Sequence, residues 1–199
     1  MKYKVILFDG DGVTLKSGML FSEKLDLHYG IKHEVLQPFF TGVFLECTIG
    51  KADLKEELSK VLGDWGWRGG VDELLHFWFT EGTQMNEEVV EFIKSLSRAD
   101  ARFYLATDQE KYRLAAVQKI FEPFHLFKRT FCGAELGIRK KDPRFFELVY
   151  SELLATQPDL QKNEVLLVDD GQKNIDAAKT FGFDAHFYSN LEDLKHFLN

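Results

Sequence analysis

Short runs of apolar residues recur along the chain and predict the strands of a sheet. Val5 to Phe8 form a continuous rather than an alternating run, which is the pattern of a strand buried on both faces. Apolar side chains at helical spacing separate most of the predicted strands, as in 110–121 and 174–181. This alternation predicts an α/β fold with a doubly wound parallel sheet. The predicted strands cover residues 3–8, 102–106, 130–132, 165–168 and 185–188.

The interval between the first two predicted strands is far longer than a crossover connection requires. We assign residues 16–86 to an inserted helical cap, and residues 1–15 and 87–199 to the α/β core. Ser22 is the candidate cap of the first inserted helix, and most of the many aromatic residues in the insertion are interpreted as packing. Three segments of the interval have helical spacing of apolar side chains: 22–28, 51–62 and 71–79.

Composition narrows the classes of function. The chain has 199 residues, of which 45% are hydrophobic, so it can bury a core and carry a sizeable insertion. The formal net charge of −7 opposes nonspecific binding of nucleic acid, because that binding depends on Lys and Arg at phosphates. A small phosphorylated metabolite is compatible with this charge, since one metal ion and one lysine supply the local positive potential that it needs.

The cysteines and the N-terminal segment predict a cytoplasmic protein. Cys47 and Cys132 lie far apart and outside any CxxC pair, which favours reduced thiols. The first strand begins almost at once, which leaves no room for a signal peptide, and no apolar run approaches the length of a membrane span. We therefore expect no membrane association. The histidines have no metal-ligand spacing, and the oligomeric state stays open.

Two acidic residues follow the first predicted strand. Asp9 and Asp11 alternate with Gly10 and Gly12, and the glycines let the backbone approach a ligand closely. Ligands of open α/β sheets bind beyond the carboxyl ends of the strands, so an acid pair at this point is placed for chemistry. An ordinary turn is the alternative. A calcium loop does not fit, because Val13 takes the place of the third ligand.

A hydroxyl residue and a lysine mark two further junctions between elements. Thr107 ends the second predicted strand before a helix, where its hydroxyl can meet a phosphate oxygen and unpaired amides favour anions. Alternatively, Thr107 or Asp108 simply caps that helix. Lys140 stands just before Asp142 and Pro143, which predict a helix start. Lys140 could reach a bound phosphoryl group, or it could belong to a solvated basic turn.

Asp169 and Asp170 repeat the geometry of the first acid pair, at the end of the predicted strand 165–168. Parallel strands that end in acid pairs can bring hard oxygen ligands together, as Mg²⁺ requires. Two like charges about 4 Å apart repel by roughly 4 kcal/mol at an effective dielectric constant of about 20. A divalent cation removes this conflict.

These motifs, in this order, resemble those of the haloacid dehalogenase (HAD) superfamily. The resemblance spans nearly the whole chain, and the helical insertion after the first motif is similar to the C1 cap of that superfamily. It implies a HAD-like α/β core and a hydrolase activity. The residues that carry it are Asp9-x-Asp11-Gly12, Thr107, Lys140 with Asp142-Pro143, and Asp169-Asp170 with Asn174.

The resemblance also implies a role for each motif. Asp9 would be the nucleophile that forms an aspartyl-phosphate, and Asp11 would be the general acid and base. Thr107 and Lys140 would hold the phosphoryl oxygens. The ligands of Mg²⁺ would come from the first and last motifs: Asp9, the backbone carbonyl of Asp11, Asp170 and, as an additional or outer acid, Asp169.

The activity predicted on this basis is that of a magnesium-dependent phosphatase acting on a small phosphomonoester. The dehalogenase branch of the superfamily lacks the second acid of the first motif, so Asp11 favours phosphoryl transfer. A phosphomutase of the same fold and a low-turnover regulatory protein that binds metal remain alternatives.

Three residues depart from the superfamily pattern: Asp108, Lys141 and Thr14. We assign Asp108 to the substrate site together with Thr107 and Lys140. A further carboxylate at that point disfavours a phosphate dianion unless its side chain turns away, as it would in a helix cap.

Overall fold

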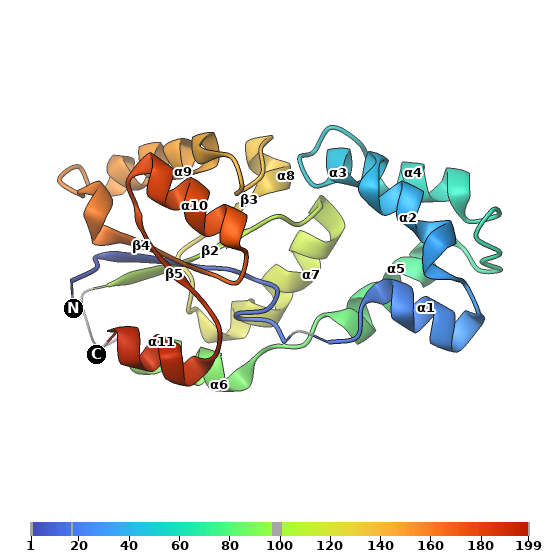
Figure 1. The fold of residues 1–199 in the computed structure, drawn as a ribbon, viewed down its shortest axis with the longest axis horizontal. Coiled ribbons are helices and arrows are strands. Elements are labelled where there is room, and N and C mark those ends of the chain that lie inside the picture. The colour runs from blue at the N-terminus through green and yellow to red at the C-terminus, as the bar shows by residue number, and fades with distance from the viewer. Residues whose placement is uncertain (1, 17, 97–100, 199) are drawn as a thin grey trace.

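The computed structural model describes residues 2–16, 18–96 and 101–198, and it confirms the predicted α/β fold. Five parallel strands form one sheet in the order β3-β2-β1-β4-β5 (Figure 1). Because β1 lies in the centre, its carboxyl end is flanked by the carboxyl ends of β2 and β4. The strands are β1 (Val5–Phe8), β2 (Arg102–Thr107), β3 (Thr130–Cys132), β4 (Val165–Asp169) and β5 (Asp184–Phe187).

Helices cover both faces of the sheet. The helices of the core are α6 (Glu87–Leu96), α7 (Lys111–Phe121), α8 (Gly133–Leu136), α9 (Pro143–Thr156), α10 (Gln172–Phe181) and α11 (Leu191–Leu198), with 3-10 turns η1 (Glu122–Phe124) and η2 (Lys162–Glu164). Helices α6 and α11 lie on one face of the sheet, and α9 and α10 on the other (Figure 1). Ile6 and Phe8 pack with α6, α7 and α11, whereas Val5 and Leu7 pack with α9 and α10. Burial of β1 on both faces explains its continuous apolar run.

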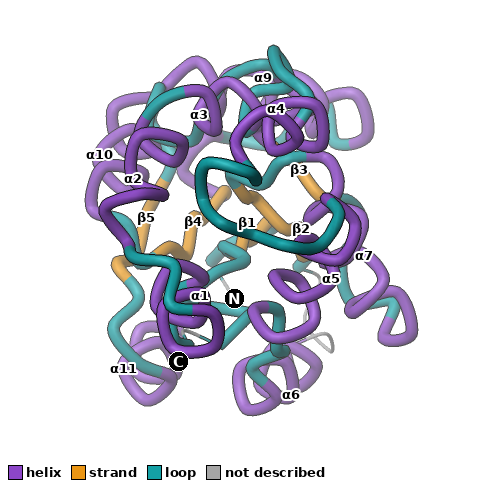
Figure 2. The backbone as a smooth tube through the Cα atoms, turned by 90° about the vertical axis from the view of Figure 1, so that its right-hand side faces the viewer, coloured by secondary structure: helices purple, strands orange, loops and turns teal. Residues whose placement is uncertain are grey.

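Between β1 and α6, the described residues form five helices, which we call the cap: α1 (Phe21–Tyr29), α2 (His33–Thr41), α3 (Val43–Cys47), α4 (Leu54–Val61) and α5 (Val71–Gly82). These helices pack around a hydrophobic core of their own, in which Phe39, Trp65 and Trp78 are buried. Figures 1 and 2 show the cap beyond the carboxyl ends of the strands. The domain boundaries at 16–86 stay a prediction.

Two local features of the cap differ from the sequence-based expectation. Ser22 does not cap the first helix, because α1 already begins at Phe21. The carboxylate of Glu23 instead accepts a hydrogen bond from the backbone N–H of Leu20 (2.8 Å). Helix α2 was not predicted, and Pro38 lies inside it, where proline normally ends or kinks a helix. Packing of Leu36 and Phe39 in the cap core stabilises α2 despite this residue.

Two chain segments that run side by side connect the cap to the core. Leu15 and Met85 form an antiparallel bridge, and the backbone N–H of Lys16 donates to the carbonyl oxygen of Gln84 (2.8 Å). The first of these segments begins a few residues after Asp9. Movement of the cap relative to the core would therefore bend the chain close to the first acid pair.

A polar contact joins the cap to α7. Asp53 caps α4, and its Oδ1 accepts hydrogen bonds from the backbone N–H groups of Lys55 (2.9 Å) and Glu56 (3.2 Å). The same carboxylate accepts a hydrogen bond from the Tyr112 hydroxyl (2.8 Å) and forms an ion pair with Lys111. Its hydrogen bond with Lys111, and then that with Tyr112, hold the pKa of Asp53 at about 2.

We expect Asp53→Asn to destabilise the protein by about 1 kcal/mol at pH 7, because Asn still caps a helix but loses the ion pair. The pKa of folded Asp53 lies below its ordinary value of 3.8, so its contribution is present above that value. The contribution is then lost as the pH falls towards 2. Urea unfolding at several pH values measures this difference, with Asp26→Asn, at a cap ion pair to Lys32, as the control. A difference that persists unchanged at pH 2 would contradict the expectation.

Two further expectations concerned the redox state of the cysteines and association with a membrane. Cys47 and Cys132 are buried and free, and burial raises the pKa of each thiol to about 11. Among the described residues, no helix combines the length and the apolar character that crossing a membrane requires.

Candidate active site at the carboxyl ends of the strands

Asp9 follows β1 directly and is buried. Its Oδ1 accepts a hydrogen bond from the backbone N–H of Gly10 (2.6 Å) and lies 2.6 Å from Nζ of Lys140. The Thr14 hydroxyl donates to the carbonyl oxygen of Asp9 (2.7 Å) and so closes the turn after the strand. Within residues 2–16, 18–96 and 101–198, no donor is bonded to Oδ2 of Asp9. The protein thus holds one oxygen of Asp9 and leaves the other for a ligand.

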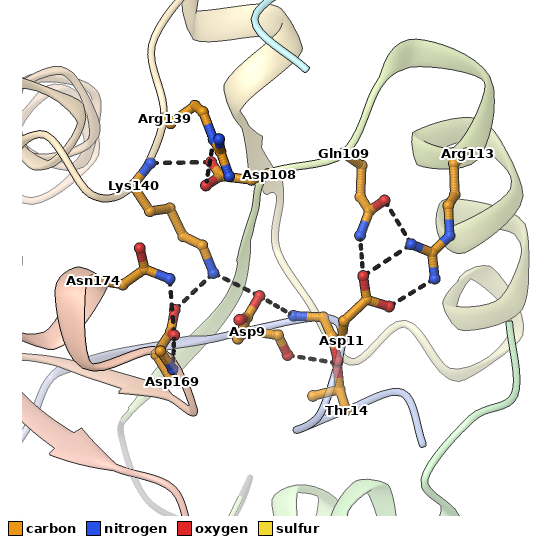
Figure 3. Close-up of polar contacts among 12 residues, drawn as sticks. Asp9, Asp11, Thr14, Asp108, Gln109, Arg113, Arg139, Lys140, Asp169 and Asn174 are labelled. Atoms are coloured by element: carbon orange, nitrogen blue, oxygen red, sulfur yellow. Dashed lines mark hydrogen bonds and ion pairs between the residues drawn. The ribbon is translucent and has the colours of Figure 1, made fainter. Parts of the chain in front are cut away.

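Lys140 lies between two carboxylates and is almost fully buried, with 2% of its side chain exposed. Its Nζ lies 2.6 Å from Oδ1 of Asp9 and 2.6 Å from Oδ2 of Asp169 (Figure 3). Burial lowers the pKa of an ammonium, but the charges of Asp9 and Asp169 outweigh burial and raise the pKa of Lys140 above its ordinary value. Lys140 is therefore a fixed cation in the centre of the cluster.

Asp108 supports the loop that carries Lys140. Its Oδ1 accepts a hydrogen bond from the backbone N–H of Lys140 (3.0 Å), and its Oδ2 accepts one from Nε of Arg139 (3.4 Å). Asp108 does not cap the helix that follows β2, and neither does Thr107. That cap is Glu110, whose carboxylate accepts hydrogen bonds from two backbone N–H groups in the first turn of α7. The interpretation of Thr107 or Asp108 as the helix cap is therefore wrong.

Asp169 and Asp170 follow one another at the end of β4 but differ in environment. Asp169 is fully buried, and in addition to the ion pair with Lys140 its Oδ1 accepts hydrogen bonds from Gly171 N–H (2.8 Å) and Asn174 Nδ2 (2.9 Å). Asp170 is exposed. Partial burial and the charge of Asp169 raise the pKa of Asp170 above its ordinary value. Asp169 is thus held in place by the protein, whereas Asp170 is open to a ligand.

Asp9, Asp169 and Asp170 form a group that can hold a metal ion. Each offers one carboxylate oxygen, and these oxygens lie within 4.8 Å of one another. When all three carboxylates are ionised, they and the single ammonium of Lys140 leave two negative charges in this cluster. Burial raises the pKa of Asp9 well above its ordinary value, against the attraction of Lys140 and with a further contribution from Asp169. A divalent cation with oxygen ligands fits both the charge and the donor atoms.

Two glycines let the ends of three strands meet. Gly12 has φ +78°, and a Cβ atom at this position would lie 2.0 Å from Oδ2 of Asp170. A Cβ atom at Gly10 would lie 3.0 Å from Oγ1 of Thr107, which is buried at the end of β2. Side chains at these positions would displace Asp170 or Thr107. The structure therefore brings together the first, second and last motifs that the sequence singled out.

Asp11 points towards α7 rather than into the carboxylate cluster (Figure 3). Nη1 and Nη2 of Arg113 donate to Oδ2 (2.9 Å) and Oδ1 (2.7 Å) of Asp11, and Nε2 of Gln109 donates to Oδ2 (2.7 Å). Sequence reasoning missed Gln109 and Arg113. Their place directly after the Thr107 motif was the available signal, because residues there lie near the carboxyl end of a strand that neighbours β1.

The sequence model of the haloacid dehalogenase-like hydrolase family matches residues 3–182. No curated protein matched the chain.

The solved structures that share the fold include the following three. A HAD family enzyme from Bacteroides thetaiotaomicron, in complex with magnesium and inorganic phosphate, is 18% identical with a TM-score of 0.81, covering 99% of this chain and 100% of that one. A predicted HAD-like family hydrolase from Porphyromonas gingivalis is 21% identical with a TM-score of 0.71. The match covers 100% of this chain and 99% of that one. The third is the L-2-haloacid dehalogenase of Xanthobacter autotrophicus with chloropropionic acid covalently bound. It is 18% identical with a TM-score of 0.67, and the match covers 98% of this chain and 82% of that one.

At these identities the similarity to solved structures establishes the fold alone. The family match is independent of it and extends over most of the chain, including all four motifs. The protein therefore belongs to the haloacid dehalogenase-like hydrolase family.

Proposed function

We propose that the protein is a magnesium-dependent phosphatase that hydrolyses a small phosphomonoester through an aspartyl-phosphate. The observation that carries the proposal is the buried ion pair of Lys140 with Asp9 (2.6 Å), next to the carboxylate of Asp170. This cluster combines a nucleophile, a cation for a phosphoryl oxygen and a metal ligand. The structure of the Bacteroides thetaiotaomicron enzyme with magnesium and inorganic phosphate supports the same ligand chemistry.

The ligands of Mg²⁺ are proposed to be Asp9, Asp170 and the backbone carbonyl of Asp11. Both oxygens of Asp169 already accept hydrogen bonds, so this residue is better suited to hold Lys140 than to bind the ion directly. When bound, the ion would neutralise negative charge on the carboxylates and on the phosphoryl oxygens.

The proposed reaction uses Asp9 and Lys140 of the cluster together with Asp11 and Thr107. An oxygen of Asp9 attacks phosphorus, the bond from phosphorus to the leaving oxygen breaks, and Asp11 gives a proton to that oxygen. Lys140 and Thr107 hold the phosphoryl oxygens as charge develops on them. Water then attacks the phosphorus of the aspartyl-phosphate, Asp11 takes a proton from that water, and inorganic phosphate leaves with Asp9 restored. The cap excludes bulk water and selects the alcohol portion of the substrate.

Asp108 is proposed as a support for Lys140 rather than as a direct ligand of the substrate. Both of its oxygens accept hydrogen bonds from the loop of Arg139 and Lys140. A carboxylate turned in this way repels a phosphate dianion less than one that faces the phosphoryl site.

A panel of phosphorylated metabolites tests the proposal. With Mg²⁺ present, the protein is expected to release inorganic phosphate from at least one small phosphomonoester and from p-nitrophenyl phosphate. Excess EDTA is expected to abolish this release, and added Mg²⁺ to restore it.

Other outcomes of the same panel would overturn the proposal. Isomerised phosphate esters without free phosphate would make the protein a phosphomutase. Chloride release from 2-chloropropionate, assayed beside the panel, would make it a dehalogenase. Absence of turnover on every compound would leave a regulatory protein that binds metal.

A further inference from the structure

The Asp11 carboxylate is held by a planar fork of two hydrogen bonds. Nη1 and Nη2 of Arg113 contact different oxygens of Asp11, at 2.9 and 2.7 Å. Such a bidentate contact fixes both the position and the plane of the carboxylate. The side chain of Asp11 is 49% exposed, whereas that of Arg113 is 14% exposed. A mostly buried guanidinium thus anchors an acid that faces solvent on its other side.

Gln109 completes a closed network around the same carboxylate. Its Nε2 donates to Oδ2 of Asp11 (2.7 Å), and its Oε1 accepts from Nη1 of Arg113 (3.0 Å). Gln109 is buried. Its backbone carbonyl oxygen accepts a hydrogen bond from Sγ of Cys132, which lies at the end of β3 (3.0 Å). Each member of the network therefore restrains the other two.

Among the donors of residues 2–16, 18–96 and 101–198, those that contact Asp11 leave one acceptor position of its carboxylate open. An ionised carboxylate offers about four acceptor positions. Arg113 and Gln109 take both positions on Oδ2 and one on Oδ1. The remaining position on Oδ1 is the one at which Asp11 can exchange a proton with a leaving oxygen or with water.

The helical turn that carries Arg113 is itself fixed on two sides. The buried carboxylate of Glu110 accepts hydrogen bonds from the backbone N–H groups of Tyr112 and Arg113. The Tyr112 hydroxyl donates to Asp53 of the cap (2.8 Å). Arg113 therefore has a rigid base from which to hold Asp11.

We propose that Arg113, assisted by Gln109, is the positioning residue for the general acid and base Asp11. This inference rests on the proposed phosphatase function. It assigns to two residues of the β2–α7 junction the task of holding the Asp11 carboxylate in one orientation beside the carboxylate cluster, with the open position on Oδ1 available to the leaving oxygen. Neither residue needs to touch the phosphoryl group itself.

Dependence on the leaving group separates this role from general structural support. p-Nitrophenolate leaves without a proton, whereas the alkoxide of benzyl phosphate needs one from Asp11. Arg113→Met is expected to lower kcat/KM for benzyl phosphate by about 100-fold and for p-nitrophenyl phosphate by less than about 10-fold. Arg113→Lys keeps the charge but lacks the fork, so it should restore only part of the loss. Arg129→Met, at an exposed arginine paired with Glu152, is the matched control and should change neither value.

A double-mutant cycle tests whether Arg113 acts through Asp11. In the background of Asp11→Asn, Arg113→Met is expected to have no further effect on kcat/KM for benzyl phosphate. The same cycle, measured on the free energy of unfolding in urea, should give a non-zero coupling between the two residues.

The outcomes distinguish this inference from the function on which it rests. Wild-type activity with equal losses of Arg113→Met on both substrates, or with an additive cycle, overturns the positioning role and leaves the phosphatase intact. Absence of phosphate release by the wild-type protein overturns both. Selective loss on benzyl phosphate, with a cycle that is not additive, establishes the positioning role.

Discussion

Asp9→Asn is expected to lower kcat for phosphate release by about 10⁵-fold or more, because loss of a nucleophile removes the covalent route altogether. Asn has nearly the same shape but is a poor nucleophile, and it carries no charge to pair with Lys140. Phosphate release from p-nitrophenyl phosphate measures the loss. Acid quenching during turnover of a ³²P-labelled substrate should trap a phosphoenzyme in the wild-type protein and none in the variant.

The matched control for this variant is Asp72→Asn. The Asp72 side chain is 84% exposed and pairs with Lys55 on the surface of the cap, so its activity should stay within about twofold of wild type. A labelled phosphoenzyme in Asp9→Asn would contradict the assignment of the nucleophile. Turnover by this variant at the wild-type rate would exclude covalent catalysis by Asp9.

Lys140→Met is expected to reduce both stability and activity. The substitution leaves Asp9 and Asp169 buried without the ammonium that lies 2.6 Å from each. Removing one partner of a buried ion pair costs about 3–5 kcal/mol. The loss of a charge that stabilises the phosphoryl oxygens should also lower kcat/KM by about 10²–10³-fold.

The stability deficit of Lys140→Met should depend on pH. Burial raises the pKa of folded Asp9 above its ordinary value even in the presence of Lys140, so protonation of Asp9 favours the folded state. The protonated form is fully present below the ordinary pKa and is lost as the pH rises through the raised one. In Lys140→Met, which lacks the ammonium, protonation of Asp9 stabilises the folded state more than it does in the wild-type protein. The stability lost by the variant relative to wild type should therefore be smaller at pH 4 than at pH 7.

Urea unfolding in EDTA at the two pH values measures this deficit. Lys195→Met, at a surface pair with Glu192 on α11, is the control and should differ from wild type by less than about 0.5 kcal/mol. A deficit that grows as the pH falls would contradict the proposed electrostatic origin.

Local patterns in the sequence determined much of the α/β core. The continuous apolar run of β1 predicted a strand buried on both faces, and Asp142 with Pro143 predicted the start of α9. Because parallel strands share one carboxyl edge, the polar residues that follow them could be expected to converge. Asp9, Asp169 and Asp170 lie together for this reason.

Side-chain partners between distant segments could not be predicted in the same way. Asp108 was a candidate helix cap, yet it holds the backbone of Lys140, which lies far along the chain. Glu110 caps α7 instead, although its sequence neighbours gave no reason to prefer it. The contact of Asp108 depends on where the Lys140 loop docks against the end of β2.

The sequence by itself determined the fold class, the order of the four motifs and the residue types at the strand ends, because these depend on periodicity within short segments. Only the tertiary structure decided the partners of Asp11 and the contact of Asp53 with Tyr112. The physical reason is that hydrogen bonds and ion pairs between distant segments depend on packing geometry to within a few tenths of an ångström. No local pattern of residues encodes that geometry.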